Sequence, residues 1–378
     1  MTNSIQDIVK VLSDYRKAEK IMRISAKIKE ISRKLRKDYE IIKIMHVCGT
    51  HEHTITYFGL RSLLPENIDL IAGPGCPVCI VPARDIDEII KIGLEYGVRI
   101  YTYGDMYRVP GSHVSLAKAR AEGLDVKVVY SFIDAIRDAE KINKDTIFFG
   151  VGFETTQPTI ASRIIHGIPK NLKIYSSYRL TVPVMRYVLD RPDIPLNGII
   201  APGHVSVIVG AGAWGYISQE YGLPVVIAGF EPLDIMLAVL VILTQLSKGQ
   251  AETINIYTRT VTWHGNKVAQ EYIKKVFNVT DGAWRGLGVI PETALEFKEE
   301  YLPINAKEHF KVSITSSRDI VPGCKCPEII LGKAKPTDCP YFLKACTPQN
   351  PLGACMVSQE GTCAIWAKYG FRPNLKIK

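Results

Sequence analysis

The nine cysteines of this 378-residue chain are distributed very unevenly. Six of them fall within 40 residues near the C-terminus, at Cys324, Cys326, Cys339, Cys346, Cys355 and Cys363. The other three lie far upstream in two short motifs, with Cys48 in HVCGTHEHT and both Cys76 and Cys79 in GPGCPVC. Thiolates bind soft metals and exchange disulfides, so this distribution indicates metal or thiol redox chemistry.

The six C-terminal cysteines suit a [4Fe–4S] cluster, because iron–sulfur centres are normally held by four thiolates. The spacing is Cys324-x14-Cys339-x6-Cys346-x16-Cys363, with Cys326 and Cys355 interleaved as a possible thiol or disulfide pair. Zinc held by four cysteines is the main alternative, although structural zinc sites usually use ligand pairs two to four residues apart. Reduced structural thiols or disulfides are a further alternative.

Cys76 and Cys79 form a C-x-x-C motif, which can close a disulfide or bind a metal. Pro74 and Gly75 precede it, and a helix is expected from about Arg84. Backbone donors or a helix N-terminus near such a pair lower the pKa of its thiols. The alternative is a half-buried turn whose thiols are inert.

Cys48 has three histidines within five residues, His46, His51 and His53. It is expected at the end of a strand, where Gly49 permits a sharp turn. A thiolate there could bind a soft metal or act as a nucleophile, and with Glu52 the group also resembles a mixed hard and soft metal site. The alternative is that each histidine is an ordinary, hydrogen-bonded polar residue.

Two further motifs, GFETT and PGHVS, place Glu154, Thr155, Thr156, His204 and Ser206 at expected strand-to-helix turns. A carboxylate, hydroxyls and an imidazole could bind a small polar ligand or move protons. The alternative is structural, with Thr155 and Ser206 capping helices and Glu154 supporting its turn.

The elements that must position these motifs alternate between short apolar runs and amphipathic stretches over residues 40–250, which predicts parallel βαβ units. The expected strands are 41–46, 68–72, 98–101, 126–130, 146–150, 173–175, 198–201 and 224–228. All four motifs would then follow the carboxyl ends of strands, where open α/β sheets bind ligands. The two halves also echo each other, so an internal duplication is a hypothesis, although Gly-rich turns resemble one another in any case.

The predicted fold class is α/β, with two similar small parallel-sheet domains and a Cys-rich [4Fe–4S] domain that contains helices. The predicted ranges are an N-terminal amphipathic helix in 1–40, α/β domains in 41–140 and 141–250, and an iron–sulfur domain in 251–378. In the first range Ile21, Ile24, Ile28, Ile31 and Leu35 form one apolar stripe. This helix is expected to dock on the C-terminal domain.

The charge distribution and the length of the apolar runs argue against a nucleic-acid-binding or membrane protein. The net charge is +9, but residues 1–43 alone hold 12 Lys and Arg against 6 Asp and Glu. This basic stretch fits the solvated face of a docked helix, and no nucleic-acid recognition motif accompanies it. The longest apolar run, 235–243, is too short to span a bilayer, and no secretory signal opens the chain. We therefore expect a cytoplasmic protein that binds neither nucleic acid nor membrane, in which clustered cysteines are metal or redox ligands.

The motifs HVCGTHEHT, GPGCPVC, GFETT and PGHVS, followed by the C-terminal cysteine array, closely resemble the HypD family of iron–sulfur hydrogenase maturation proteins. The resemblance runs over essentially the whole chain, and the five features in this order are highly specific. It implies a redox-active scaffold, rather than a conventional enzyme, for assembly of the Fe(CN)2CO group of [NiFe]-hydrogenases. Its partners would be a small HypC-type chaperone and a HypE-type cyanide donor, with the hydrogenase large subunit as indirect recipient.

The resemblance also implies roles for individual residues. Cys48 would bind the transient Fe(II) that carries cyanide and CO, with Cys76 and Cys79 beside it as a redox pair. The [4Fe–4S] ligands would be the four thiols of Cys324, Cys339, Cys346 and Cys363. Cys326 and Cys355 would be a second thiol or disulfide pair, through which electrons could reach Cys48. Two alternatives stay open: a zinc-dependent hydrolase that uses Cys48, His51 and His53, and a general thiol–disulfide oxidoreductase.

Overall fold

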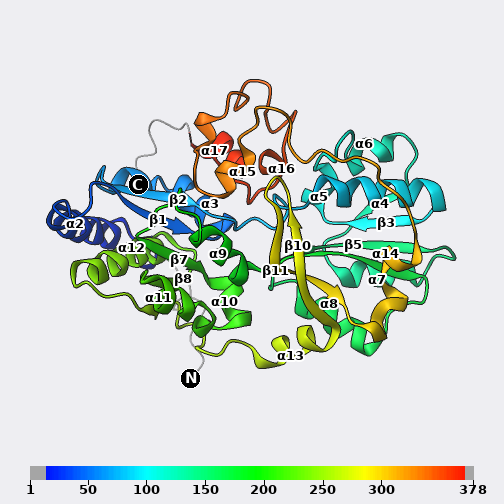
Figure 1. Cartoon of the computed structure of the whole chain (residues 1–378), viewed down its shortest axis with the longest axis horizontal. Helices are drawn as coiled ribbons and strands as arrows, with labels where there is room; N and C mark the ends of the chain where they lie inside the picture. Colours follow the sequence, from blue (N-terminus) through cyan, green and yellow to red (C-terminus); the bar gives the residue numbers. More distant parts are fainter. Residues whose placement is uncertain (1–13, 371–378) are drawn as a thin grey trace.

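Two α/β lobes lie side by side along the long axis of the molecule, and the Cys-rich segment lies between them at the top of the view in Figure 1. The computed structural model describes residues 14–370. Each lobe is built on its own parallel sheet, as the alternating pattern predicts. The predicted α/β class is therefore confirmed.

The sheet of the first lobe has the strand order β2-β1-β7-β8-β9, and all of its pairs are parallel. Its strands are β1 (Ile42–His46), β2 (Ile68–Ala72), β7 (Gly198–Pro202), β8 (Val225–Ala228) and β9 (Thr253–Asn255). Its helices are α3 (Gly49–Tyr57), η1 (Leu60–Leu63), α10 (Gly203–Val209), η2 (Ala211–Trp214), α11 (Gly215–Tyr221) and α12 (Pro232–Ser247). Strands β1, β7 and β8 are almost entirely buried, as expected for a parallel sheet covered on both faces.

The sheet of the second lobe has the order β4-β3-β5-β6 and is also parallel. Its strands are β3 (Arg99–Thr102), β4 (Val126–Val128), β5 (Thr146–Gly152) and β6 (Leu172–Tyr178). The helices that follow or connect them are α4 (Ala83–Tyr96), α5 (Gly104–Arg108), α6 (Leu116–Ala121), α7 (Phe132–Ala139), α8 (Gln157–His166) and α9 (Thr181–Leu189). Strand β5 is buried along its whole length and forms the centre of this lobe.

The sheets do not follow the predicted division of the chain at residue 140. The first sheet combines β1 and β2 with strands from the range 141–250, and the second sheet continues across residue 140. Parallel strands need crossovers of about a dozen residues or more, and a connection of that length can lead to either sheet, so the alternating pattern predicts the strands without saying which sheet each one joins. The chain enters the first lobe, builds the second, and returns through β7.

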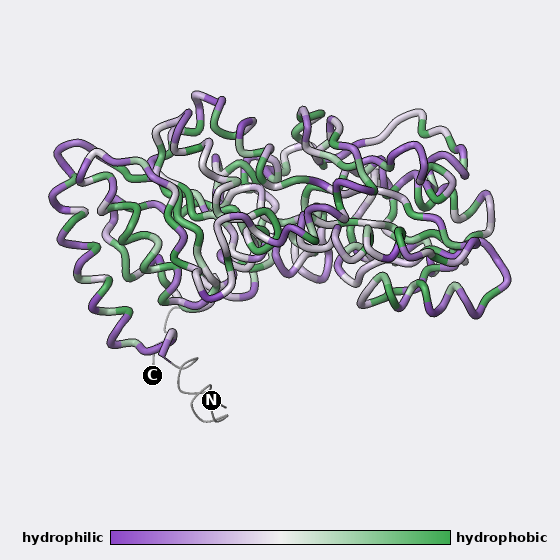
Figure 2. The backbone as a smooth tube through the Cα atoms, turned by 90° about the horizontal axis from the view of Figure 1, so that it is seen from below, coloured by the Kyte–Doolittle hydropathy of each residue, from purple (hydrophilic) through white to green (hydrophobic). Residues whose placement is uncertain are grey.

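The amphipathic helix near the N-terminus is α2 (Ala18–Leu35), and it packs on α12 of the first lobe. Ile21, Ile28 and Leu35 are buried in the core that contains Ile235 and Val239. The prediction that this helix docks on the C-terminal domain is therefore wrong for the described part of it, while residues 1–13 of the predicted range lie outside the described residues. Helix α12 is apolar on nearly every side, so it needs cover on the face turned away from the sheet. The polar outer face of α2 appears in purple at the left of Figure 2.

After β9, the last strand of the first sheet, the chain forms a long antiparallel hairpin that stands between the lobes. Its strands are β10 (Phe277–Trp284) and β11 (Gly288–Phe297), preceded by α13 (Lys267–Val276). The alternation in this region is too weak to have predicted these strands. Further along, the chain forms only short helices: η3 (Glu299–Ile304), α14 (Ala306–His309), α15 (Cys326–Ile330), η4 (Pro336–Asp338), α16 (Ala354–Val357) and α17 (Thr362–Tyr369).

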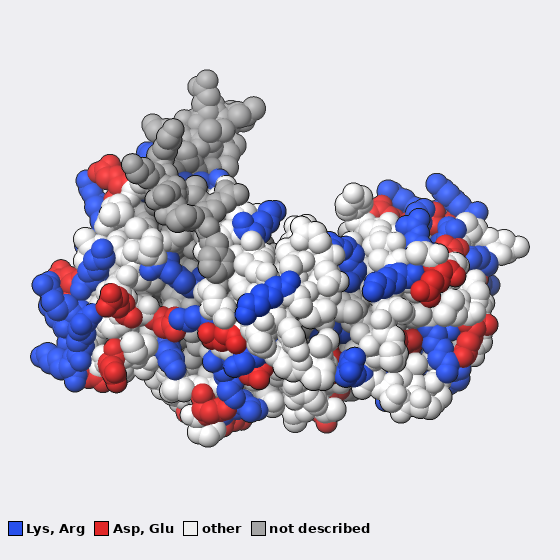
Figure 3. Space-filling model, turned by 90° about the horizontal axis from the view of Figure 1, so that it is seen from above, with Lys and Arg blue, Asp and Glu red and all other residues white. Residues whose placement is uncertain are grey.

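The Cys-rich segment shares a hydrophobic core with the second lobe. Cys326, Cys355 and Cys363 pack in one cluster with residues of α4 and β5 such as Ile89 and Phe149. Its helices are present as expected, while its binding of a cluster stays a prediction. No helix within residues 14–370 has the length and apolar character needed to cross a bilayer. On the face shown in Figure 3, acidic and basic side chains are interspersed over both lobes.

Candidate metal and thiol site

Cys48 and the C-x-x-C loop meet where neighbouring strands β1 and β2 end. Cys48 is the N-cap residue of α3, directly after β1, and the loop of Gly75 and Cys76 follows β2. The amide of Gly49 donates to the carbonyl oxygen of Gly75 at 3.3 Å. A Cβ atom at position 75 would overlap the backbone of Cys48, so only glycine allows this approach.

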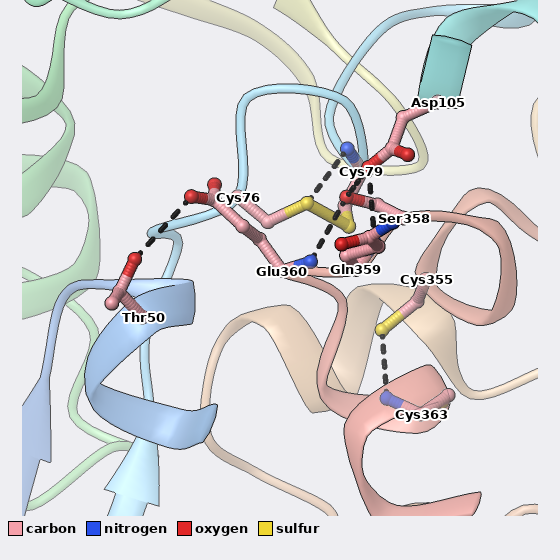
Figure 4. Close-up of a disulfide and its surroundings, with 9 residues drawn as sticks. All are labelled: Thr50, Cys76, Cys79, Asp105, Cys355, Ser358, Gln359, Glu360 and Cys363. Carbon is pink, nitrogen blue, oxygen red and sulfur yellow. Dashed lines mark hydrogen bonds between the residues drawn. A yellow bond between two sulfur atoms is a disulfide. The ribbon is translucent and has the colours of Figure 1, made fainter. Parts of the chain in front are cut away.

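Cys76 and Cys79 form a disulfide, with their Cα atoms 5.4 Å apart. The amide of Cys79 also donates to Sγ of Cys76 at 3.2 Å, which closes the loop into a tight turn (Figure 4). Both residues are buried, with exposed fractions of 8% and 1%. The C-x-x-C motif therefore forms a disulfide that is held inside the protein.

A small cavity joins this disulfide to the cysteines of both chain regions. Cys48, Cys76, Cys79, Cys355 and Glu360 all line it, and its volume is about 10 Å³. That is room for about one water molecule, so little free space remains where these groups face the cavity. The structure thus brings together three sets of thiols that the sequence separates by up to 307 positions.

Cys355 does not face the disulfide directly. Its sulfur accepts a hydrogen bond from the amide of Cys363 at 3.3 Å and points away from the disulfide in Figure 4. Cys355 lies close enough to Cys326 to raise the pKa of its thiol, so the second predicted pair is adjacent, although it is not a disulfide. Contact between Cys355 and the Cys76–Cys79 disulfide therefore requires rotation of the Cys355 side chain.

The thiol of Cys48 is only slightly accessible, and burial raises its pKa to about 11. The nearby Glu360 raises it further, while the amides of His51 and Thr50 act in the opposite direction. At neutral pH the Cys48 thiol is therefore protonated unless a cation binds to it. A soft cation would deprotonate it on binding, because a thiol that coordinates a metal ion loses its proton.

Glu360 is a site residue that the sequence analysis missed. A side chain at Gly49 would overlap it, and Thr50 Oγ1 donates to its carboxylate at 3.4 Å. Asp105 holds the turn before it by accepting bonds from Ser358 Oγ and the amide of Gln359, each at 3.0 Å (Figure 4). Burial raises the pKa of Glu360. Only the close approach of Gly49, which no local pattern encodes, places this carboxylate beside Cys48.

Glu52 joins the helix of Cys48 to the C-terminal segment. Its buried carboxylate accepts hydrogen bonds from Nε2 of His46 at 2.8 Å, from Nη2 of Arg61 at 2.7 Å and from Nε1 of Trp366 at 2.8 Å. Burial by itself would raise the pKa of Glu52, but the charge of Arg61 and the His46 contact hold it well below its usual range. Since Trp366 lies on α17, which also carries Cys363, this carboxylate fixes the two cysteine-bearing helices relative to each other.

The three histidines near Cys48 have other partners, so the predicted mixed metal site is not assembled. His46 contacts Glu52, the ring of His51 bonds to the carbonyl oxygen of Gly229 at 2.9 Å, and His53 stacks on Tyr57. Within residues 14–370, no three His, Cys, Asp or Glu side chains are preformed as ligands of one metal ion. The geometry gives no support to a hydrolase that uses Cys48, His51 and His53.

The buried, neutral His51 gives a prediction about acid stability. Burial lowers the pKa of His51 to about 3, against about 6.5 in the unfolded chain. Its folded pKa is depressed, so the stabilising contribution is full above pH 6.5 and is lost as the pH falls towards 3. The unfolding free energy of the natural protein should therefore fall as the pH is lowered through this range. We expect His51→Gln to reduce that fall by roughly 3–4 kcal/mol, as measured by urea unfolding at several pH values. The matched control is His53→Gln on the same helix, whose ring is partly exposed; an equal flattening in the control would contradict the assignment.

Glu154 and His204 lie away from the Cys48 cavity. Glu154 is buried and accepts from both the amide and Oγ1 of Thr181 at 2.7 Å, at the first residue of α9. His204 is exposed and stacks on Phe230 with ring centroids 3.9 Å apart. Ser206 bonds to the carbonyl oxygen of Pro202 inside α10. The contacts of Glu154 and Ser206 are structural, as in the alternative interpretation, but the predicted capping is wrong: Ser206 lies inside α10, whose N-cap is Pro202, and the N-cap of α8 is Thr156.

The six C-terminal cysteines pack in one cluster, in which five are buried and Cys324 is partly exposed. Burial raises the pKa of Cys324 to about 12, with further contributions from Cys326, Cys339 and Cys346. Cys363 lies within electrostatic reach of Cys326, Cys346 and Cys324. The amide of Leu352 also donates to Sγ of Cys346 at 3.4 Å, a kind of contact that tunes cluster sulfurs. As a set of soft donors, Cys324, Cys339, Cys346 and Cys363 fit an iron–sulfur cluster, and zinc remains chemically compatible with them.

Comparison with known proteins places this arrangement in one family. The family model of HypD, described as the hydrogenase formation hypA family, matches residues 19–370. The chain is 39% identical over 367 residues to the hydrogenase maturation factor HypD of Escherichia coli, covering 96% of this chain and 98% of that protein. The same factor of Cupriavidus necator is 38% identical over 374 residues, covering 96% and 97%. That of Azotobacter vinelandii is 42% identical over 340 residues, covering 87% and 89%. With its motifs, its fold and these relatives in agreement, the chain belongs to the HypD family of hydrogenase maturation factors.

Proposed function

We propose that this protein is a redox-active scaffold for assembly of the Fe(CN)2CO group of [NiFe]-hydrogenases. A small HypC-type chaperone would share the iron with it, and a HypE-type protein would donate cyanide. The observation that carries the proposal is the cavity shared by Cys48, the Cys76–Cys79 disulfide and Cys355. A soft metal anchor beside a disulfide, with Cys355 of the second pair lining the same cavity, suits ligand chemistry on iron better than hydrolysis.

Cys48 is the anchor for the iron cargo in this proposal. Low-spin Fe(II) with cyanide and CO needs a soft, electron-rich ligand, and a thiolate supplies it. Cys48 caps α3, so the first amides of that helix favour the thiolate once the cation has displaced the proton. Gly49 and Gly75 keep the backbone close around it without filling the space above the sulfur with side chains.

Thiol–disulfide exchange would link the two redox pairs. After its sulfur leaves the amide of Cys363, Cys355 could attack the disulfide, and Cys326 is placed to complete the exchange. A [4Fe–4S] cluster bound by Cys324, Cys339, Cys346 and Cys363 would supply electrons one at a time. Cys355 lines the same cavity as the Cys76–Cys79 disulfide, which supports direct exchange once the Cys355 side chain has rotated and brought its sulfur to the disulfide.

The decisive experiment is isolation of the full chain together with its small chaperone under anaerobic conditions. Infrared spectroscopy should then show cyanide and CO stretching bands, and chemical analysis should find iron, acid-labile sulfide and cyanide. Iron without diatomic ligands in the complete, cyanide-supplied system would refute the scaffold function. Zinc in place of iron and sulfide would refute the cluster.

The cluster assignment leads to a separate prediction. Cys339→Ala removes one of four ligands from the buried thiol group, so we expect loss of most of the brown visible absorption and of the acid-labile sulfide. The matched control is Cys355→Ala, a buried cysteine of the same segment outside the predicted ligand set. The cluster assignment fails if the control loses the absorption and Cys339→Ala retains it.

A general thiol–disulfide oxidoreductase is the remaining alternative, favoured by the Cys76–Cys79 disulfide itself. That disulfide is buried, however, so a large protein substrate could reach it only after the surrounding loops open. Carriage of diatomic ligands on iron in the experiment above would separate the two functions.

A further inference from the structure

The turn of the β10–β11 hairpin is wedged between the two thiol-bearing segments. Trp284 and Arg285 at this turn are buried, with exposed fractions of 0% and 1%. Gly286 has a φ of +70°, and a Cβ atom there would lie 2.6 Å from Cγ of Pro327, next to Cys326. On its other side the turn contacts the chain just after the Cys76–Cys79 disulfide.

Arg285 makes these contacts through three separate donors. Its amide donates to the carbonyl oxygen of Ile80 at 2.9 Å, and its Nε donates to that of Val81 at 2.8 Å. Its Nη2 donates to the carbonyl oxygen of Pro110 at 2.5 Å. Ile80 and Val81 directly follow Cys79, so one side chain fixes the exit of the disulfide loop and ties it to the segment after α5.

The setting of this guanidinium is unusual for a structural arginine. Among residues 14–370, no carboxylate oxygen lies within 4 Å of it, and its hydrogen bonds go to neutral carbonyl groups. A buried charge without a close ionic partner is costly, and such departures from ordinary packing concentrate at functional sites. Its position between the disulfide loop and the segment of Cys326 suggests what that function is.

We propose that Arg285 is a positioning residue for exchange between the Cys76–Cys79 disulfide and the Cys326/Cys355 pair. This inference rests on the exchange described under the proposed function, and it does not depend on the iron cargo. Arg285 holds the disulfide loop from behind, so that its sulfurs stay beside Cys355 when that side chain rotates. Without the Arg285 side chain, the loop exit keeps the backbone contact at Ile80 but loses its bond at Val81 and its link to Pro110, so the sulfurs are held less firmly at the cavity.

The electrons and protons of this exchange balance within the chain. The Cys355 thiolate attacks one sulfur of the Cys76–Cys79 disulfide, a new S–S bond forms, and the other sulfur leaves as a thiolate that takes up a proton. Cys326 then attacks Cys355 in this mixed disulfide, forms the Cys326–Cys355 disulfide and releases the second thiol. Two electrons and two protons pass from the Cys326/Cys355 pair to Cys76 and Cys79, with no external reagent.

The test uses a background that stops the exchange halfway. In full-length Cys326→Ser protein, Cys355 can form the mixed disulfide but cannot be released from it by Cys326. The ratio of mixed disulfide to Cys76–Cys79 disulfide then measures how well the sulfurs are placed. To measure it, anaerobically equilibrated protein is quenched with acid and its free thiols are then blocked with N-ethylmaleimide. Non-reducing digestion and mass spectrometry identify the disulfides.

We expect Arg285→Met in this background to lower the ratio about tenfold while the thermal midpoint shows a folded protein. Arg285→Lys keeps the positive charge and one donor group at the end of the side chain, so it should recover part of the lost ratio. The matched control is Arg179→Met, because Arg179 is also buried and grips the same hairpin, donating to the carbonyl oxygen of Ala283 at 2.9 and 2.7 Å, but its charged neighbours include no thiol. That control should change the ratio less than about twofold.

The proposal is overturned if Arg285→Met leaves the ratio unchanged, or if Arg179→Met lowers it equally. It also falls if the mixed disulfide does not form with Arg285 intact. If Arg285→Met does not fold, Arg285→Gln decides by the same ratio, since it shortens the side chain and removes the charge. Failure of the scaffold function would appear separately, as absence of the infrared bands, and would leave this ratio as it is.

Discussion

Cys48→Ala is expected to abolish carriage of the Fe(CN)2CO unit while the iron–sulfur spectrum stays intact. Cys48 is the cysteine that caps α3 at the carboxyl end of β1, and the neighbouring pair Cys76 and Cys79 is tied up in a disulfide. Alanine there removes the soft anchor and adds no bulk. The C-terminal thiols are untouched, because the cavity contains only Cys355 from that group.

The measurement is infrared spectroscopy of the variant isolated with its small chaperone, together with visible absorption of the same sample. His53→Gln is a suitable control on the same helix, because that ring packs on Tyr57 and Tyr369 and not on the cavity. Cyanide and CO bands of normal intensity in Cys48→Ala would show that the iron is anchored elsewhere. Loss of both bands and cluster absorption would instead indicate that the variant is misfolded.

Glu52→Gln is expected to have the largest effect on stability, a loss of roughly 3–5 kcal/mol. The glutamine keeps the shape of the side chain, but the buried carboxylate that accepts from Arg61, His46 and Trp366 loses its charge. Breaking a buried ionic network leaves its partners uncompensated, which is why the cost exceeds that of a surface pair. Because the pKa of Glu52 is depressed in the folded protein, this stabilisation is present above its unfolded pKa and is lost as the pH falls towards the folded value.

Urea unfolding of the two full-length proteins measures this difference. Glu220→Gln is the matched control, since Glu220 forms a two-point contact with Arg186 on the surface, where both side chains are about half exposed. We expect the control to lose far less stability, because water and salt screen an exposed ion pair. A loss in Glu52→Gln no greater than in the control would mean that this carboxylate does not hold α3 and α17 together.

The Glu52 contact also bears on function, because it connects two helices that carry different thiols. Cys48 stands at the start of α3 and Cys363 lies on α17, three positions before Trp366. A carboxylate of α3 that accepts from Trp366 therefore sets the distance between Cys48 and the C-terminal thiol group. The relative placement of the lobes and the Cys-rich segment thus depends on a few buried polar contacts in addition to apolar packing.

Much of the local structure follows from the sequence, because local patterns carry it. Short apolar runs that alternate with amphipathic stretches predicted all strands from β1 to β8, and the apolar stripe of α2 predicted its helix. The motif residues were also found from local pattern, since strand-end turns with Cys, His and Gly stand out within a few positions. Cys48, Cys76 and Cys79 were identified in this way, and neighbouring strands bring them together.

Long-range features were decided only by the tertiary structure. The interleaving of the two sheets, the docking of α2 on α12 and the hairpin of β10 and β11 all depend on contacts between distant residues. Glu360, Glu52 and Arg285 acquire their roles through partners that lie up to 314 positions away. A carboxylate or guanidinium has no local signature of its partner, because its cost of burial is offset by whichever groups the fold brings to it. The sequence by itself therefore determined which residues could do chemistry, while the tertiary structure decided which of them meet, because only packing places a thiol beside another thiol.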